Sequence, residues 1–389
     1  MRGIPDDPAT QAADEALARG IHDAGTRLVL AAAGGGSGAL ARLLQTPGAS
    51  RSVLEAVVPY SEPALIDWLG GRPDQFCSEP TGRAMAMAAY LRAVRWAGGD
   101  PAGPPLAGAA CTASLASDRP KRGPHRIHVG CQTADATASW SVELVKGRRT
   151  RAEEEQVAAR LFLNAIARAC GLTQRLEPGL KEDEAVAERF VTAPPDWREL
   201  LAGRVAMARH GAASGAASPR PRLVFPGAFH PLHHGHRRMA ELARQKLGAP
   251  VEFEISVINV DKPPLDFIEM ANRLGQFAPE ETVWLTRAAT FEEKSAQFPG
   301  ATFIVGADTL RRVADARYHG RDPAAWRAAM ERIAARGCRF LVFGRRQEDR
   351  FLRLRDLDLQ PPLKELCQEV PYDEFHEDIS STEIRRRNR

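Results

Sequence analysis

The chain reads LVFPGAFHPLHHGH from Leu223 to His236, and this stretch has the layout of a strand, a tight turn and the start of a helix. Its first residues form a short apolar run, which is typical of a buried parallel strand. Proline and glycine punctuate the turn, and an amphipathic pattern then runs from Arg237 to Leu247. Amide groups at a helix start lack partners within the helix, and the helix dipole favours an anion beside them. The stretch therefore predicts a phosphate site, with the imidazoles of His233 and His236 as hydrogen-bond donors at its mouth.

The spacing of these residues resembles the signature of the nucleotidyltransferase superfamily. That superfamily includes nicotinamide-mononucleotide adenylyltransferases, pantetheine-phosphate adenylyltransferases and small cytidylyltransferases. The matching positions are Gly227, Phe229, Pro231, His233, Gly235 and His236. The resemblance implies that the two histidines hold a triphosphate and that Gly227, Ala228, Phe229 and Gly235 line the nucleotide site. Two other interpretations are a histidine-rich loop without a ligand and a metal site, although zinc would more usually recruit cysteine or a carboxylate.

The end of the chain resembles the second motif of the same superfamily. Residues 379–385 read ISSTEIR, and locally Ser380 and Glu383 form a capping box that opens a terminal helix. A capping box without a ligand is the alternative interpretation. The resemblance implies that this helix start binds the triphosphate, because orphan amides, hydroxyls and a guanidinium converge on an anion. The residues concerned are Ser380, Ser381, Thr382 and Arg385.

Between these motifs, a strand expected over residues 302–305 leads into Gly306-Ala307-Asp308. This block resembles one in the nicotinamide-mononucleotide adenylyltransferases, which implies that Gly306 lies in the nucleotide site and that Asp308 contacts a ribose or base group. The alternative is that Asp308 only caps the following helix. Lys262 follows the strand expected over residues 251–260, and the carboxyl ends of such strands face the ligand crevice. Lys262 is a candidate phosphate contact or a solvated loop lysine. Arg345 and the next arginine could also reach a phosphate, although a solvated basic turn is the favoured interpretation of each alone.

A second glycine-rich loop, residues 34–38, follows an expected strand over 26–31 and precedes a helical pattern over 39–44. No lysine follows at the P-loop position, so a tight turn without a ligand is at least as good an interpretation as a phosphate loop. Three blocks in this region resemble the CinA C-terminal family, which includes nicotinamide-nucleotide amidohydrolases. The blocks are Thr46-Pro47-Gly48-Ala49-Ser50, Val57-Val58-Pro59-Tyr60-Ser61 and Ala110-Cys111-Thr112.

The residues that would carry amidohydrolase chemistry are not in place. A Ser–Lys mechanism needs a hydroxyl and a nearby amine that takes its proton. The position of the serine holds Ala33 or Gly34, and the position of the lysine holds Leu65. We therefore expect a catalytically degenerate homologue that binds a nucleotide, mediates oligomerisation or simply packs. A displaced nucleophile at Ser37 is the alternative.

The chain has 389 residues, a length that favours two domains. Residues 211–219 read GAASGAASP, and their small side chains and final proline make them the best linker. We therefore expect a CinA-like domain over 1–210, a linker over 211–219 and a nucleotidyltransferase domain over 220–389. In the first domain the pattern predicts a helix over 151–169, which Gly171 would end, and further helical turns to about Met207. The expected class is α/β in both domains, with a Rossmann-like parallel sheet in the second.

Composition limits the partners and the setting. The six cysteines are scattered without CxxC spacing, so we expect neither a disulfide framework nor a zinc site, and a reduced, cytoplasmic protein. No apolar run reaches membrane-spanning length, so no membrane partner is expected. The net charge of +4 permits anionic nucleotides but does not argue for nucleic acid.

Together these features predict adenylyl transfer from ATP to a small phosphorylated acceptor, with release of pyrophosphate. The catalytic residues would be His233, His236 and Arg385, and Mg²⁺ would accompany the triphosphate as cofactor. Nicotinamide mononucleotide or its acid is the favoured acceptor, and a homo-oligomer would form through the CinA-like domain. Pantetheine-phosphate adenylyl transfer, cytidylyl transfer and a non-catalytic nucleotide sensor or scaffold remain alternatives. Residues 317–320 and the helix expected over 323–336 do not match the acceptor-binding aromatic segment of the bacterial adenylyltransferases, so the acceptor stays open. Class I aminoacyl-tRNA synthetases share a His-x-Gly-His motif, but the chain lacks their lysine-rich partner motif.

Overall fold

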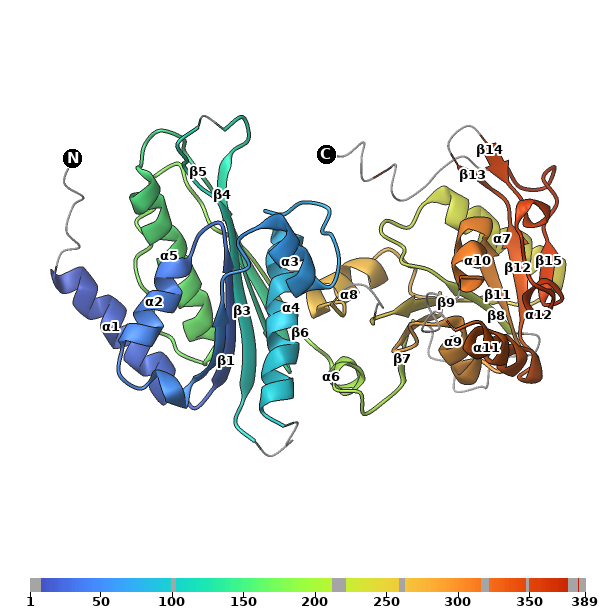
Figure 1. Cartoon of the computed structure of the whole chain (residues 1–389), viewed down its shortest axis with the longest axis horizontal. Coiled ribbons are helices and arrows are strands. Elements are labelled where there is room, and N and C mark those ends of the chain that lie inside the picture. Colours follow the sequence, from blue (N-terminus) through green and yellow to red (C-terminus); the bar gives the residue numbers. More distant parts are fainter. Residues whose placement is uncertain are drawn as a thin grey trace. The chain divides into compact units, whose positions relative to one another are not determined.

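The computed structural model describes residues 8–98, 103–119, 121–211, 222–258, 263–315, 322–347, 350–376 and 384. Its two large sheets, each accompanied by helices, confirm the predicted α/β class (Figure 1). The chain divides into two compact units. Unit 1 holds Met1–Arg198 together with Asp261–Glu269, and unit 2 holds Glu199–Val260 together with Met270–Arg389. A short segment from late in the chain therefore belongs to unit 1. The predicted linker lies outside the described residues except for Gly211.

Unit 1 contains a six-stranded sheet in the order β2-β1-β3-β4-β5-β6. The first three strands in that order pair in parallel, and the remaining pairs are antiparallel. The sequence pattern predicted helical turns where β6 lies. This prediction was wrong, because the segment pairs with β5 as an edge strand. The strands are β1 (Arg27–Ala33), β2 (Val53–Val57), β3 (Leu106–Ser114), β4 (His125–Thr133), β5 (Ala136–Leu144) and β6 (Ala187–Thr192).

Helices cover both faces of this sheet (Figure 1). One face carries α1 (Pro8–Asp23), α2 (Ser37–Gln45) and α5 (Arg151–Ala169), and the other carries α3 (Glu62–Leu69) and α4 (Glu79–Trp96). A short 3-10 turn, η1 (Ala49–Arg51), precedes β2.

Helix α4 lies directly on the sheet because two strand positions are glycine. A Cβ atom at Gly108 would lie 2.1 Å from the backbone nitrogen of Tyr90, and one at Gly130 would lie 2.6 Å from the carbonyl oxygen of Gly82. Any larger residue would push the helix away from β3 and β4. This close approach buries the side chain of Arg83, which follows Gly82 on the same helix.

Unit 2 contains a seven-stranded sheet in the order β15-β12-β11-β8-β9-β10-β7. Every pair in it is parallel except β10 with β7, which confirms the predicted parallel sheet. The strands are β7 (Met207–His210), β8 (Arg222–Pro226), β9 (Val251–Ser256), β10 (Val283–Thr286), β11 (Ala301–Gly306), β12 (Arg339–Phe343) and β15 (Cys367–Glu369). A small hairpin, β13 (Arg345–Gln347) with β14 (Arg350–Leu352), follows β12.

The strand order of unit 2 reverses between β8 and β11. From β8 the chain moves through β9 to β10 on one side, and it then returns to place β11 on the other side of β8. In open parallel sheets the loops at the carboxyl ends of strands diverge at such a point and leave a crevice that binds ligands. The loops that follow β8 and β11 therefore border the expected ligand site.

The helices of unit 2 bury aromatic and aliphatic side chains against its sheet. Buried residues of β11, β12, α10 and α11 form one core cluster. The helices are α6 (Pro195–Leu201), which begins in unit 1, α7 (His234–Leu247), α8 (Phe267–Leu274), α9 (Phe291–Gln297), α10 (Ala307–Val313), α11 (Pro323–Ala335) and α12 (Pro361–Lys364), with a 3-10 turn η3 (Leu354–Asp356).

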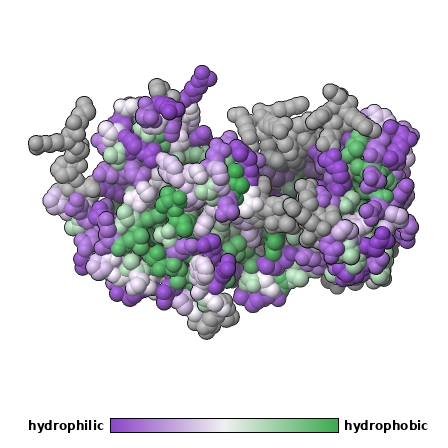
Figure 2. Space-filling view, in the orientation of Figure 1, coloured by the Kyte–Doolittle hydropathy of each residue, from purple (hydrophilic) through white to green (hydrophobic). Residues whose placement is uncertain are grey.

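The surface of each unit is mixed in character. Figure 2 shows hydrophilic residues over most of the visible face and a hydrophobic area on unit 1. Across the described part of the chain, none of the helices has the length and apolar content needed to cross a bilayer.

Candidate nucleotide-binding site

The loop between β8 and α7 follows a path that aromatic packing holds in place. The peptide bond between His230 and Pro231 is cis, and Phe229 has a φ of 44°. The Phe229 ring is buried and makes edge contacts with the rings of Phe225, Phe253 and Phe277 at centroid distances of 5.4–5.5 Å. A Cβ atom on Gly227 would lie 2.6 Å from that ring, so the turn requires glycine at this position.

The two histidines of the loop lie against each other. The ring centroids of His233 and His236 are 3.7 Å apart, with an angle of 26° between the ring planes. The backbone N–H of His233 donates to Nδ1 of His236 over 3.3 Å. Because Nδ1 accepts this bond, the proton of the neutral ring resides on Nε2, where it is available to a ligand.

The His236 ring is kept uncharged by its surroundings. Burial, followed by the nearby charges of His233, Arg345 and Arg237, lowers the pKa of His236 to about 3. At neutral pH His236 is therefore a neutral hydrogen-bond donor. The sequence indicated a donor at this position, and the structure adds that it is not a cation.

Two side chains at the end of α8 and just after it bond the backbone of the same loop. The amide of Gln276 accepts from the backbone N–H of Leu232 over 2.8 Å and donates to the carbonyl of Phe229 over 2.9 Å. The guanidinium of Arg273 donates to the carbonyl of Ala228 over 3.1 Å. Sequence reasoning missed both residues, because nothing in their local pattern distinguishes them from other polar helix residues.

A second group of predicted residues lies at the end of β11. Gly306 is the last residue of the strand and the N-cap of α10, and Asp308 lies in the first turn of that helix. The Asp308 carboxylate pairs with the guanidinium of Arg345 over 2.6 Å. Arg345 opens β13, separated from the end of β12 by one residue, so the side chain predicted to lie in a solvated turn is in fact in an ion pair at the carboxyl edge of the sheet.

The structure brings these groups to one edge of unit 2. The His233–His236 loop follows β8, and Gly306 with Asp308 follows β11, its neighbour across the reversal in strand order. Arg345 connects them, because it pairs with Asp308 and its charge contributes to the low pKa of His236. Ala228 lies in the same loop, and Gly235 is buried in the first turn of α7. Five predicted contacts lie outside the described residues, namely Lys262, Ser380, Ser381, Thr382 and Arg385.

The glycine-rich loop of unit 1 is occupied by a side chain of the protein itself. The carboxylate of Glu155, on α5, accepts hydrogen bonds from the backbone N–H groups of Gly36 and Gly38, each over 3.0 Å. It also accepts from the hydroxyl of Ser37 over 3.1 Å. The amides at the start of α2 are therefore bonded to an internal anion, which supports the interpretation of this loop as a turn without a bound phosphate.

Within the described ranges, no three histidine, cysteine, aspartate or glutamate side chains form a group that could hold a metal ion. Mg²⁺ is commonly bound through substrate phosphates and few protein ligands.

Comparison with known families identifies the C-terminal region. The cytidylyltransferase-like family model matches residues 224–387. This region, which contains both predicted motifs and the edge described above, is therefore a domain of the nucleotidyltransferase superfamily. The protein is accordingly a nucleotidyltransferase enzyme.

Solved structures similar to this chain are competence-damage proteins, the group that the N-terminal blocks resemble. The protein CihA from Agrobacterium tumefaciens is 19% identical, with coverage of 43% of this chain and 99% of its own and a TM-score of 0.31. A protein from Klebsiella pneumoniae is 18% identical, with coverage of 42% and 99% and a TM-score of 0.33. TM-scores this low do not assign a function to unit 1. No curated protein matches the chain.

Proposed function

We propose that the protein transfers an adenylyl group from MgATP to nicotinamide mononucleotide or its acid and releases pyrophosphate. The observation that carries the proposal is the stacked His233–His236 pair, which borders the strand reversal of a nucleotidyltransferase domain. A neutral imidazole with its proton on Nε2 suits a donor to a phosphate oxygen, because it binds the anion without having to lose or gain a proton.

In this reaction a phosphate oxygen of the acceptor attacks the α-phosphorus of ATP. The bond between the α-phosphorus and the oxygen bridging to the β-phosphate breaks, and pyrophosphate leaves with the electron pair. The protein needs no nucleophile of its own, so its residues act by positioning and by stabilising negative charge. His236 and His233 would donate to the phosphates, and Arg345 would supply a positive charge at the same edge. Ser380, Ser381, Thr382 and Arg385 would hold the outer phosphates, and Lys262 would be a further phosphate contact.

Two features support a nicotinamide nucleotide as acceptor. The Gly306-Ala307-Asp308 block resembles that of nicotinamide-mononucleotide adenylyltransferases, and the N-terminal blocks resemble a family that acts on nicotinamide nucleotides. Asp308 would then contact a ribose or base group, which requires it to share or release Arg345. Cytidylyl transfer from CTP is the second candidate, because the matching family model is described as cytidylyltransferase-like.

The test is pyrophosphate release by the full-length protein with Mg²⁺. ATP and CTP would each be combined with nicotinamide mononucleotide, its acid and pantetheine phosphate. Release with ATP and a nicotinamide nucleotide would support the proposal, and release with CTP only would replace it by the second candidate. ATP binding without release from any pair would contradict both and favour a nucleotide sensor.

A further inference from the structure

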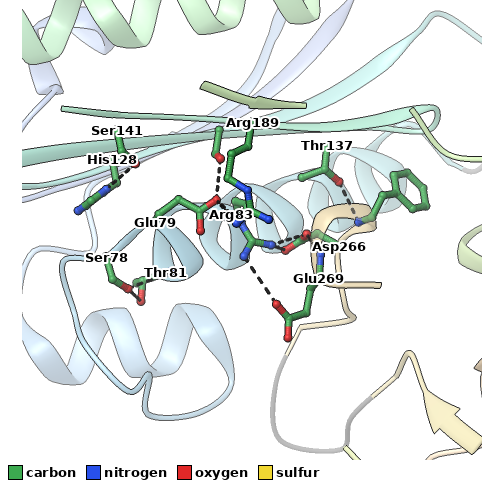
Figure 3. Close-up of polar contacts among 12 residues, drawn as sticks. Ser78, Glu79, Thr81, Arg83, His128, Thr137, Ser141, Arg189, Asp266 and Glu269 are labelled. Atoms are coloured by element: carbon green, nitrogen blue, oxygen red, sulfur yellow. Dashed lines mark hydrogen bonds and ion pairs between the residues drawn. The ribbon is translucent and has the colours of Figure 1, made fainter. Parts of the chain in front are cut away.

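A buried arginine of unit 1 binds the start of α8. Arg83 is 2% exposed, and its Nε donates to Glu79 over 2.8 Å on the same helix. Its guanidinium also pairs with the carboxylate of Asp266 and lies 3.7 Å from a carboxylate oxygen of Glu269 (Figure 3). The nearby acidic groups outweigh the cost of burial and raise the pKa of Arg83. Residues 266–269 are thus held by a buried cation that comes from an early helix of the chain.

The first turn of α8 is also capped by unit 1. The Asp266 carboxylate accepts from the backbone N–H of Glu269 over 2.8 Å, as an N-cap does. The backbone N–H of Phe267 donates to the hydroxyl of Thr137, on β5, over 3.0 Å (Figure 3). The buried Phe267 ring stacks on Trp197 at a centroid distance of 6.4 Å. The Asp266 charge and the amides of Phe267 and Glu269 are therefore satisfied within unit 1.

The same helix leads into the residues that hold the histidine loop. Unit 1 includes α8 up to Glu269, and unit 2 includes it from Met270 onward. Arg273 lies near its end and Gln276 lies just after it, and these are the side chains that bond the backbone at Ala228, Phe229 and Leu232. Asp266 therefore caps the helix that carries Arg273, and an eight-residue helix is only about 12 Å long.

An ion cluster of this kind is better suited to placing a helix than to stabilising a fold. The cost of removing charges from water largely offsets their mutual attraction, and apolar residues of similar volume often stabilise a fold equally well. Directional bonds from a guanidinium nevertheless select one orientation of the helix that they cap. The cluster therefore restricts where α8 begins.

We propose that Arg83 is a positioning residue for the transfer reaction, acting through α8 on the loop that carries His233 and His236. The expected effect on the rate of pyrophosphate release rests on the proposed function. The inference assigns unit 1 a role that requires no amidohydrolase chemistry, which is to order the nucleotide site of unit 2. Arg83 touches no substrate in this scheme, and its effect passes through Asp266, Arg273 and Gln276.

The first test measures pyrophosphate release by full-length Arg83→Gln and Arg83→Lys variants. Misplacement of catalytic groups by a distant change costs up to about 100-fold in rate, so we expect Arg83→Gln to lower kcat/KM about tenfold or more, mainly through kcat. Arg83→Lys keeps a cation beside Asp266 and should recover part of the loss. The matched control is Arg149→Gln, which removes another arginine of unit 1 that pairs with a glutamate, Glu184, over 2.6 Å. Equal losses in Arg83→Gln and in this control would overturn the proposal.

A double-mutant cycle tests the path through α8. If Arg83 acts through Gln276, then Arg83→Gln combined with Gln276→Ala should lose less activity than the product of the two single losses. A fully multiplicative loss would contradict that path. Should Arg83→Gln fail to fold, Asp266→Asn removes the ion pair while its amide oxygen still caps α8, and it is expected to give the same pattern.

Hydrogen exchange separates this proposal from the proposed function, because it needs no substrate. Backbone amides over residues 227–236 should exchange faster in Arg83→Gln than in the wild-type protein and in Arg149→Gln. Unchanged exchange would overturn the positioning role even if pyrophosphate release were found. Faster exchange in a protein that releases no pyrophosphate would retain the coupling and refute the assigned reaction.

Discussion

Two loops of this protein share one local design and differ in what fills them. Each follows a buried parallel strand, turns through glycine and opens a helix, one between β1 and α2 and the other between β8 and α7. In unit 1 the amides of Gly36 and Gly38 are bonded to the carboxylate of Glu155. In unit 2, the neutral amide of Gln276 and the cationic guanidinium of Arg273 bond backbone groups of the loop at Leu232, Phe229 and Ala228.

The comparison indicates that a helix start can bind an outside anion only where no side chain of the protein already bonds its amides. The helix dipole favours an anion at both helix starts. In unit 1 a distant helix brings a carboxylate to the amides at the helix start, whereas Gln276 and Arg273 bond backbone groups that precede α7. The four predictions that follow test this difference, beginning with the largest effect.

Loss of the His236 ring should abolish transfer while leaving the fold intact. Removing one preorganised donor from a site of developing negative charge costs about 100- to 1,000-fold in kcat. We therefore expect His236→Ala to lower pyrophosphate release by at least about 100-fold. His210→Ala, at an exposed position of β7, is the control and should retain wild-type rates. Wild-type rates in His236→Ala would remove the histidine loop from the reaction.

Removing Glu155 should make the loop of unit 1 behave like an open anion site. The change leaves the amides of Gly36 and Gly38 without their acceptor, at a cost of about 1–3 kcal/mol in the free energy of unfolding. Inorganic phosphate can accept hydrogen bonds from the amides that Glu155 no longer bonds. It should therefore raise the melting temperature of Glu155→Ala more than that of the wild-type protein. Glu153→Ala removes a carboxylate from the same helix, where it caps Thr150, and should show no such phosphate effect. An equal phosphate effect in all three proteins would show that the loop does not act as an anion site.

The histidine loop should also make stability depend on pH. His236 has a pKa of about 3 in the folded protein and an ordinary value of 6.5. Below pH 6.5 the histidine is protonated in the unfolded chain but stays neutral in the folded protein. The free energy of unfolding therefore falls as the pH is lowered. The contribution is at most about 1.4 kcal/mol per pH unit. Urea unfolding at pH 7 and pH 5 should show a smaller decrease in His236→Gln than in the wild-type protein, and identical decreases would contradict the low pKa.

The smallest effect is expected at Ser37, the alternative nucleophile. Its hydroxyl donates to Glu155 in an exposed position, where a hydrogen bond contributes about 1 kcal/mol or less. Ser37→Ala should therefore change stability little. Neither it nor the wild-type protein should release ammonia from nicotinamide mononucleotide. Ammonia release that disappears in the variant would restore amidohydrolase chemistry to unit 1.

Local patterns predicted the elements that depend on local interactions. The β8 strand, its turn and α7 were predictable because apolar periodicity, glycine and proline act over a few residues. Helix α5, over Arg151–Ala169, was predicted at its observed bounds, since the Thr150–Glu153 capping box and the apolar face both lie in the sequence. By contrast, β6 was predicted as helical turns, because an edge strand is defined by its partner β5 rather than by its own residues.

The sequence by itself therefore determined the α/β class, the two phosphate-loop patterns and the identity of the histidine pair. Only the tertiary structure decided that the loop of unit 1 is filled by the protein itself, because Glu155 reaches Gly36 across 119 residues of chain. It also decided that Arg345 pairs with Asp308 and that Arg83 binds Asp266 across 183 residues. The physical reason is that hydrogen bonds and ion pairs depend on distance in space, whereas a sequence pattern records only neighbours along the chain.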